Sequence, residues 1–293
     1  MVLFGGSKIS EGSKTTYISK LKKLNENKVP TDVLFLKNTK GILEKIELIP
    51  NPNTRRSAII AVVSVLKDNK KFKKEYAIYH AEMMKLNSIL NKTSFKSDST
   101  KEKQTNVKME DLLARQKELA AVLPVIKNKR KLSDDQLLEL HDLVIVSLYT
   151  LLPPRRNVDY SEMVAAAPTE DKTKNYYNKG QFFFNCYKTQ GTYKQQVIEL
   201  PAELNEILKT WVKFKPKGSE YLLVKLPTNA KYLSTDMTKL LKSVFQNENI
   251  GVSVLRNVFL SSKYADVMAN LKKDAEQMGT SIGVAESTYI KKN

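Results

Sequence analysis

The first third of the chain carries apolar residues at every third or fourth position, which is the spacing of one face of an α-helix. Four segments share this spacing and are predicted to be helices, at residues 13–24, 38–46, 54–68 and 74–90. The third segment is apolar on more sides than a surface helix needs. We therefore expect it to lie at the centre of a small helical bundle.

Between residues 91 and 107 this pattern is lost. The segment NKTSFKSDSTKEKQTNV is rich in Ser, Thr and Lys and has no apolar period, which is typical of a linker. We predict a helical domain at residues 1–95, a polar linker at 96–108 and a second domain at 109–293. A chain of 293 residues is long enough for two domains that each bury a core.

Helical spacing returns after the linker. A strongly apolar segment begins at Ser133, which is followed by acidic residues and is therefore predicted to cap a helix. Pro153 and Pro154 end this helix, because proline lacks an amide donor and fixes the backbone angle. Arg155 and Arg156 then emerge at a stiff bend. The other helices of the second domain are predicted at residues 109–123, 202–214, 235–246, 252–262 and 265–278.

A different pattern occupies residues 175–200, where aromatic and β-branched residues surround Gly180 and Gly191. We predict three short antiparallel strands there, with hairpin turns near residues 178–180 and 189–192. Lys188 then lies at the mouth of the second hairpin. The predicted fold class is mostly α with a small antiparallel β-sheet, an α+β fold.

Positive charge dominates the composition, with 49 Lys and Arg against 31 Asp and Glu and a formal net charge of +18. Such a surplus fits a polyanionic partner, and double-stranded DNA is the first candidate. The alternative is a chain whose lysines only keep it soluble. The residues predicted to contact nucleic acid are Arg155 at the bend, Lys194 in the second hairpin, and the cluster Lys127, Lys129, Arg130 and Lys131.

Cysteine and histidine are scarce. Cys186 is the single cysteine, so no internal disulfide can form and a reducing compartment is expected. Two histidines and one cysteine cannot build a transition-metal site, and we expect no metal and no cofactor. The sequence has neither a long apolar span nor the basic start and apolar core of a secretory signal. We expect a soluble intracellular protein, in the cytoplasm or nucleus of a host, without membrane contact.

Four segments together resemble the motif boxes of the tyrosine recombinases, the phage-integrase family: LLPPRRNVDY, NCYKTQGTYK, VSVLRNVF and MGTSIGVAESTYIKK. Arg156 falls on the arginine of the family's first box, with Arg155 as an alternate or a second phosphate contact. Lys188 matches the lysine of the hairpin, and Arg256 matches the arginine of the second box. Tyr289 follows the third box at the family's interval.

The resemblance implies a role for each of these residues. Tyr289 would attack the scissile phosphorus and become joined to the 3′ phosphate. Arg156 and Arg256 would neutralise the non-bridging oxygens, and Lys188 would protonate the departing 5′ oxygen. The phosphotyrosine keeps the energy of the broken bond, so the strand can be resealed without a nucleotide.

The chain departs from the family at two positions. Ser253 and Thr280 stand where the second and third boxes have histidines. Both can donate a hydrogen bond but are poor bases near neutral pH. Loss of a general base costs on the order of a hundredfold to ten-thousandfold in rate. His141, on the helix before the arginine bend, is the histidine that could approach the site in space.

The first domain resembles, at the level of its helical pattern, the core-binding domain of the same family, which grips the far side of the duplex. The resemblance implies a site-specific DNA recombinase or integrase, acting as a homo-oligomer, dimer or tetramer, on DNA. Two alternatives stay open. One is a type IB topoisomerase-like enzyme with the same chemistry. The other is a DNA-binding protein on the same fold that has lost its activity.

Overall fold

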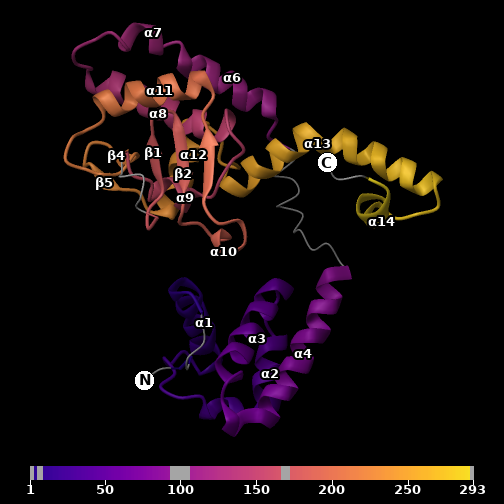
Figure 1. Ribbon diagram of the computed structural model, residues 1–293. Coiled ribbons are helices and arrows are strands. Elements are labelled where there is room, and N and C mark those ends of the chain that lie inside the picture. Colours follow the sequence, from indigo (N-terminus) through magenta and orange to yellow (C-terminus); the bar gives the residue numbers. More distant parts are fainter. Residues whose placement is uncertain (1–2, 5–8, 93–105, 166–171, 291–293) are drawn as a thin grey trace. The chain divides into compact units, whose positions relative to one another are not determined.

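The computed structural model describes residues 3–4, 9–92, 106–165 and 172–290, and it divides the chain into two compact units, Met1–Lys96 and Ser97–Asn293 (Figure 1). The described part is mostly helical with a small antiparallel sheet, as predicted. The predicted linker lies outside the described residues except for positions 106–108.

Unit 1 is a helical bundle organised around its third helix. Ile59, Ala61 and Val62 of that helix are almost completely buried, which confirms the prediction that it lies at the centre. It packs most closely against α1 and α4. The elements of unit 1 are α1 (Glu11–Leu24), η1 (Leu34–Lys37), α2 (Thr39–Glu47), α3 (Pro52–Leu66), η2 (Lys70–Phe72) and α4 (Lys73–Lys92).

The described part of unit 2 begins with three helices, α6 (Met109–Ala120), α7 (Leu123–Ile126) and α8 (Asp134–Thr150). The second half of α8 is buried and forms the middle of the core, with α6 and α11 (Ala202–Phe214) packed against it. Ser133 and Gln136 form a reciprocal capping box at its start, and the helix ends before Pro153, both as predicted.

The three-stranded sheet has the order β1 (Tyr176–Asn178), β2 (Gln181–Phe184) and β3 (Gln196–Glu199), all antiparallel as predicted. Gly180 makes the first turn at φ +89°, a conformation that favours glycine. The second connection differs from the predicted turn, because it contains a short helix, α10 (Gln190–Tyr193). A two-stranded ribbon follows α11, with β4 (Val224–Lys225) and β5 (Ala230–Lys231).

The last part of unit 2 corrects one prediction. We expected two helices, at 252–262 and 265–278, whereas α13 is one helix over Val252–Gln277. The segment between them lacks Gly and Pro, so nothing in the backbone interrupts the helix. Before it comes α12 (Ser234–Val244), and after it come α14 (Ile282–Val284) and the π-helical turn η3 (Ala285–Tyr289).

The outer half of α13 extends away from the sheet and the other helices of unit 2 (Figure 1). Every residue from Ser261 to Asn270 is exposed. The chain then turns back against the helix, where the Thr280 amide donates to the Ala275 carbonyl at 2.9 Å. None of the helices in the described ranges is both long and apolar enough to cross a membrane.

Candidate functional site

Three arginines from two distant segments meet at one cavity of unit 2, of about 230 Å³. The bend after α8 supplies Arg155 and Arg156, and the second turn of α13 supplies Arg256. The remaining lining residues come from the same bend, from α9 (Asn157–Ser161), from the surroundings of α10 and from β3: Pro153, Pro154, Asp159, Tyr187, Thr189, Tyr193, Gln196 and Ile198. The structure therefore brings together the three arginines of the first two motif boxes.

Arg155 is held in place from several sides. Its guanidinium carbon lies 3.7 Å from the centre of the Phe184 ring and 4.9 Å from that of Tyr187. Its Nε donates to Asp159 Oδ2 at 3.1 Å, and its Nη1 donates to Gln196 Oε1 at 2.8 Å. Arg155 is therefore part of the wall of the cavity, with much of its donor capacity already used.

Asp159 is the buried acid of the site, with 1% of its surface exposed. Its Oδ2 receives Arg155, but its Oδ1 has no hydrogen-bond partner among the described residues. Burial raises the pKa of the carboxyl above its usual value, and the neighbouring Arg155 and Arg156 only partly offset this effect. The Oδ1 oxygen is itself buried, so the carboxyl holds Arg155 and does not present a free acceptor to the cavity.

Arg156 and Arg256 differ from Arg155, because neither side chain makes a hydrogen bond or an ion pair within the described residues. Arg156 is partly exposed and Arg256 is exposed. A guanidinium stays charged at any physiological pH and can bind two phosphate oxygens at once. These two side chains are therefore the cations of the cavity that remain available to an anion.

Lys188 lies on the rim of the same region. Its neighbours Tyr187 and Thr189 both line the cavity, while Lys188 itself is exposed and is not a lining residue. Tyr187 fixes this segment, because its hydroxyl donates to the Lys194 carbonyl at 2.7 Å. The backbone of Lys188 therefore lies next to the cavity that the arginines line.

The other three catalytic candidates lie outside the cavity. Ser253 is exposed on the first turn of α13, three residues before Arg256. Thr280 and Tyr289 follow the outer end of that helix, and 58% of the Tyr289 surface is exposed. The 26 residues of α13 span about 39 Å at the helical rise per residue. The structure thus brings the arginines together but does not place the Tyr289 phenol among them.

His141 belongs to the core and not to the site. Its Nε2 lies 3.1 Å from the Tyr232 hydroxyl, and its ring packs against those of Trp211 and Tyr232. The histidine has 1% of its surface exposed and is not a lining residue of the arginine cavity. The suggestion that it approaches the site is therefore wrong, because aromatic neighbours on the inner side of α8 hold it.

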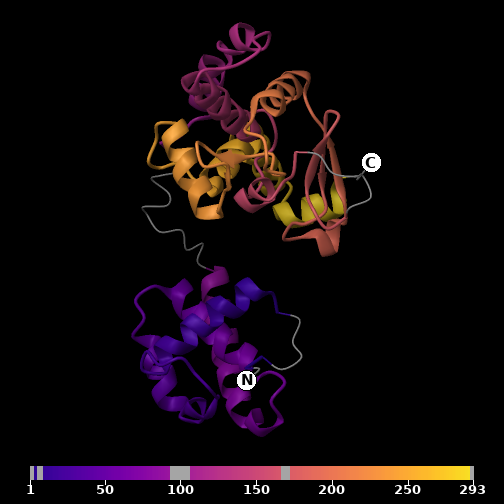
Figure 2. The ribbon, with the colours of Figure 1, turned by 90° about the vertical axis from the view of Figure 1, so that its left-hand side faces the viewer.

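The basic cluster at residues 127–131 also lies apart from the cavity. It follows α7, at the end of unit 2 opposite to α10 (Figure 1 and Figure 2). Lys127 pairs with Glu206 at 3.0 Å, and the Lys213 ammonium donates to the carbonyls of Lys127 and Lys129. Lys129, Arg130 and Lys131 are thus at a surface separate from the arginines. Lys194, next to α10, is on the side of the cavity.

Sequence reasoning missed four polar or aromatic residues of the site. They are Tyr187, Thr189, Tyr193 and Gln196, all in or beside the connection between β2 and β3. Their proximity to Lys188 in the chain was the available signal. That signal could not show which of them face the arginines, because the helical turn of α10 sets their directions.

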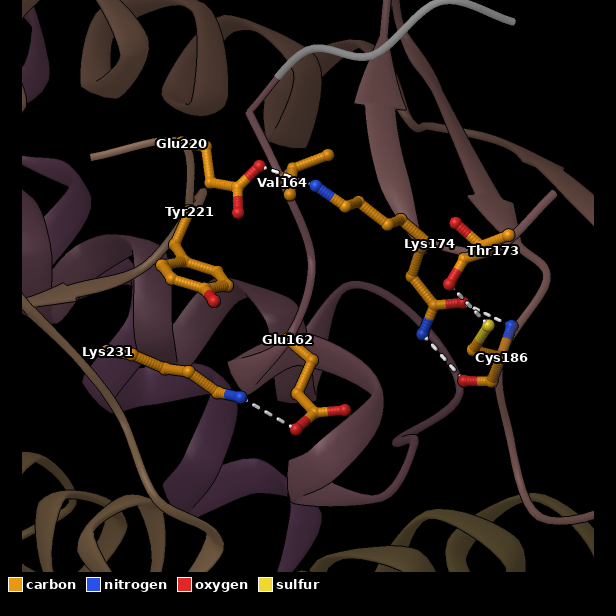
Figure 3. Close-up of a pocket in the computed structure, with 9 residues that line it drawn as sticks. Glu162, Val164, Thr173, Lys174, Cys186, Glu220, Tyr221 and Lys231 are labelled. Atoms are coloured by element: carbon orange, nitrogen blue, oxygen red, sulfur yellow. Dashed lines mark hydrogen bonds and ion pairs between the residues drawn. The ribbon is translucent and has the colours of Figure 1, made fainter. Parts of the chain in front are cut away.

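A second cavity, of about 180 Å³, has a different set of lining residues and is drawn in Figure 3. Lys174 pairs with Glu220 at 2.7 Å, and Lys231 pairs with Glu162 at 2.8 Å. The hydrogen bond that Lys231 donates to Glu162 raises the pKa of this lysine. Because two lysines face two glutamates, this cavity has no surplus charge to attract a phosphate. The arginine cavity is therefore the better candidate for an anion.

The described residues contain no group of three or more His, Cys, Asp or Glu side chains that could hold a metal ion. The arginine cavity offers fixed positive charge and aromatic walls. Comparisons of the chain with models of protein families, with curated proteins and with solved structures found no match.

Proposed function

We propose that this chain breaks and rejoins DNA strands in the manner of the tyrosine recombinases, with unit 2 as the catalytic domain and unit 1 as a core-binding-like domain. The observation that carries the proposal is the meeting of Arg155, Arg156 and Arg256 at one cavity. Two of these arginines come from boxes that lie far apart in the sequence, and their recombinase-like roles require them to act on one phosphate. The formal charge of +18 supports a DNA partner.

The chemistry assigned to each residue follows from the charges that must be balanced. Arg156 and Arg256 bind the non-bridging oxygens of one phosphodiester and offset the charge that develops there. The Tyr289 phenol loses its proton to water, its oxygen attacks phosphorus, a new oxygen–phosphorus bond forms, and the bond to the 5′ oxygen breaks. Lys188 gives its proton to that 5′ oxygen. Rejoining is the reverse, in which a 5′ hydroxyl displaces the tyrosine.

Within one copy of the chain, this reaction requires the segment that carries Tyr289 to move relative to the cavity, because Tyr289 is not a lining residue. The outer half of α13 has few packing contacts to lose, since residues 261–270 are all exposed. Segments with little buried surface change position at low cost in free energy. DNA, or a second copy of the chain, would supply the contacts that hold Tyr289 in place.

The second candidate function is a DNA-binding protein that does not cut. The position of Tyr289 outside the cavity favours it, as does the replacement of both box histidines by Ser253 and Thr280. The arginine cavity would then hold one backbone phosphate and fix the protein on the duplex. Such phosphate contacts position a protein without reading sequence.

Covalent trapping separates these functions. The protein is incubated with a nicked suicide duplex, and a protein–DNA band that survives denaturation is sought. We expect the band with the unchanged chain and not with Tyr289→Phe. Tyr264→Phe is the matched control, because Tyr264 is also an exposed tyrosine of the C-terminal segment, at 45% exposure.

The other results are equally informative. Binding without any covalent band favours the non-catalytic function. A covalent band formed by single copies that never pair two duplexes favours a topoisomerase-like enzyme. A band that persists in Tyr289→Phe contradicts the assignment of Tyr289, and Tyr193→Phe then tests the exposed phenol that does line the cavity.

A further inference from the structure

Asn175, immediately before β1, uses its side chain fully although it is no part of the sequence motifs. Only 2% of its surface is exposed. Its Nδ2 donates to the carbonyls of Asp159 at 3.1 Å and Cys186 at 2.9 Å. Its Oδ1 accepts from the amides of Asn185 at 2.9 Å and Cys186 at 2.8 Å. A side-chain amide has two donor hydrogens and two acceptor lone pairs, so all four are used.

These four bonds join two segments that the candidate site depends on. Asp159 belongs to α9, which begins directly after Arg156, and its side chain holds Arg155. Asn185 and Cys186 follow the end of β2 and lead directly to Tyr187 and Lys188. Asn175 therefore connects the backbone that carries the arginine pair to the backbone that carries the lysine.

Backbone groups of this kind need partners, because a buried amide or carbonyl without a hydrogen bond is costly. Asn185 and Cys186 lie past the last paired residue of β2, so the sheet does not satisfy their amides. The Asn175 side chain accepts the hydrogen bonds from these amides that a neighbouring strand would otherwise accept. Its length fixes how far the lysine segment lies from α9.

We propose that Asn175 is a positioning residue that sets the distance between the arginine pair and Lys188. This inference rests on the proposed function, in which Arg156 binds the phosphate and Lys188 protonates its leaving oxygen. Both groups act on the same phosphodiester, so their spacing must match the size of one phosphate group. Misplacement of a reacting group by about 1 Å can cost a hundredfold in rate.

The test compares Asn175→Ala and Asn175→Asp with the unchanged chain on two DNA substrates. One is an ordinary suicide duplex, and the other has sulfur in place of the bridging 5′ oxygen. Sulfur leaves as a thiolate and needs no proton, so the second substrate does not require a correctly placed Lys188. Asn175→Asp keeps the shape and the acceptors but loses both donors.

We expect both variants to cleave the ordinary duplex about a hundredfold more slowly. We expect cleavage of the sulfur-containing duplex within a few-fold of the unchanged chain, with DNA affinity changed by less than twofold. Asn205→Ala is the matched control, because the Asn205 side chain also holds the sheet, through the Tyr177 hydroxyl at 2.8 Å. That variant should cleave both substrates at the unchanged rate.

Equal slowing on both substrates, or no slowing on either, overturns the inference. The inference is also overturned if circular dichroism shows that neither Asn175 variant folds, because Asn175 is then required for the fold and not for the site. If the unchanged chain forms no covalent band with either substrate, the proposed function fails and this inference fails with it. A normal band with unaffected variants overturns the inference alone.

Discussion

The guanidinium carbon of Arg155 lies 3.7 Å from the centre of the Phe184 ring, and this stack separates the roles of two adjacent arginines. Phe184 is completely buried in the core of unit 2, so Arg155 is tied to the sheet. Arg156, the next residue, has no such partner among the described residues. One arginine therefore shapes the cavity, and its neighbour remains available to bind there.

This difference predicts opposite effects for two neighbouring substitutions. Arg155→Ala should lower the free energy of unfolding by about 3 kcal/mol, because it leaves the buried Asp159 without its charged partner. Arg156→Ala should change that free energy by less than about 0.5 kcal/mol, because the side chain makes no hydrogen bond or ion pair among the described residues and acts on Asp159 less strongly than Arg155 does. Urea unfolding of both variants measures the two values.

For DNA binding, we expect the larger effect from the substitution of Arg156, which has the smaller effect on stability. Arg156→Ala should weaken binding and reduce the slope of log affinity against log salt by about 0.9, the effect of one lost phosphate contact. Arg155→Lys serves as the control that keeps the charge but loses the flat stack. Equal loss of stability in the two alanine variants would contradict the division of roles.

The acid of the site predicts a pH dependence whose sign can be derived. The folded-state pKa of Asp159 is raised above its ordinary value of 3.8, chiefly by burial. The folded chain then holds this proton more strongly than the unfolded chain. The stabilising contribution is complete below the ordinary pKa and is lost as pH rises through the folded-state pKa.

Asp159→Asn replaces the carboxyl by a neutral group of the same shape and removes this dependence. We expect the free energy of unfolding of the unchanged chain, minus that of the variant, to fall as pH rises from just below 3.8. Denaturant unfolding of both proteins at several pH values measures the difference. An increase with pH would mean that the pairing with Arg155 outweighs burial.

How much the sequence could predict differed from segment to segment. The cap at Ser133 and the stop at Pro153 depend on neighbouring residues, and both predictions are confirmed. The roles of Arg155 and Arg156 depend on Phe184 and Gln196, which are distant in the chain. No local pattern could therefore separate the two arginines.

Two other features show the same limit. The continuous helix α13 was predicted as two helices, because the apolar period fades where the helix leaves the core and has nothing to pack against. The four hydrogen bonds of Asn175 go to backbone atoms of three residues, and backbone atoms have no signature in a sequence. Its role could be recognised only once the chain segments were in place.

Lys194 offers a prediction that separates backbone strain from charge. Its backbone has φ 56° and ψ −152°, a region that only glycine adopts freely. Lys194→Gly should raise the free energy of unfolding by about 1 kcal/mol relative to Lys194→Ala, since both remove the ammonium and only glycine relieves the strain. Thermal or urea unfolding of the pair provides the comparison.

The same two variants test the predicted contact with DNA. If the Lys194 ammonium neutralises a phosphate, both should reduce the salt slope of binding by about 0.9. If Lys194→Gly is more stable than Lys194→Ala but neither variant changes the salt slope, the backbone at Lys194 is strained and its ammonium does not contact DNA.

The length of α13 predicts which copy of the chain supplies the phenol. Arg256 lies in the second turn of this 26-residue helix and Tyr289 follows its outer end, so Tyr289 reaches its own cavity only if the helix bends or the residues after it extend back along it. The cavity of a second copy can be reached with the helix intact. We therefore expect a mixture of Tyr289→Phe and Arg156→Ala chains to form the covalent band, although neither variant forms it alone.

The band should form on the Arg156→Ala chain, which keeps Tyr289, and a size tag on one variant identifies that chain after denaturation. The Tyr289→Phe chain supplies the intact arginine cavity in this mixture. Arg156→Ala mixed with Tyr289→Phe, Arg256→Ala is the control, because no chain in it has a complete set of arginines. If the first mixture forms no band while the unchanged chain does, the phenol and the arginines act within one copy. Either α13 then bends in its exposed part, residues 261–270, or the residues after the helix extend back to the cavity.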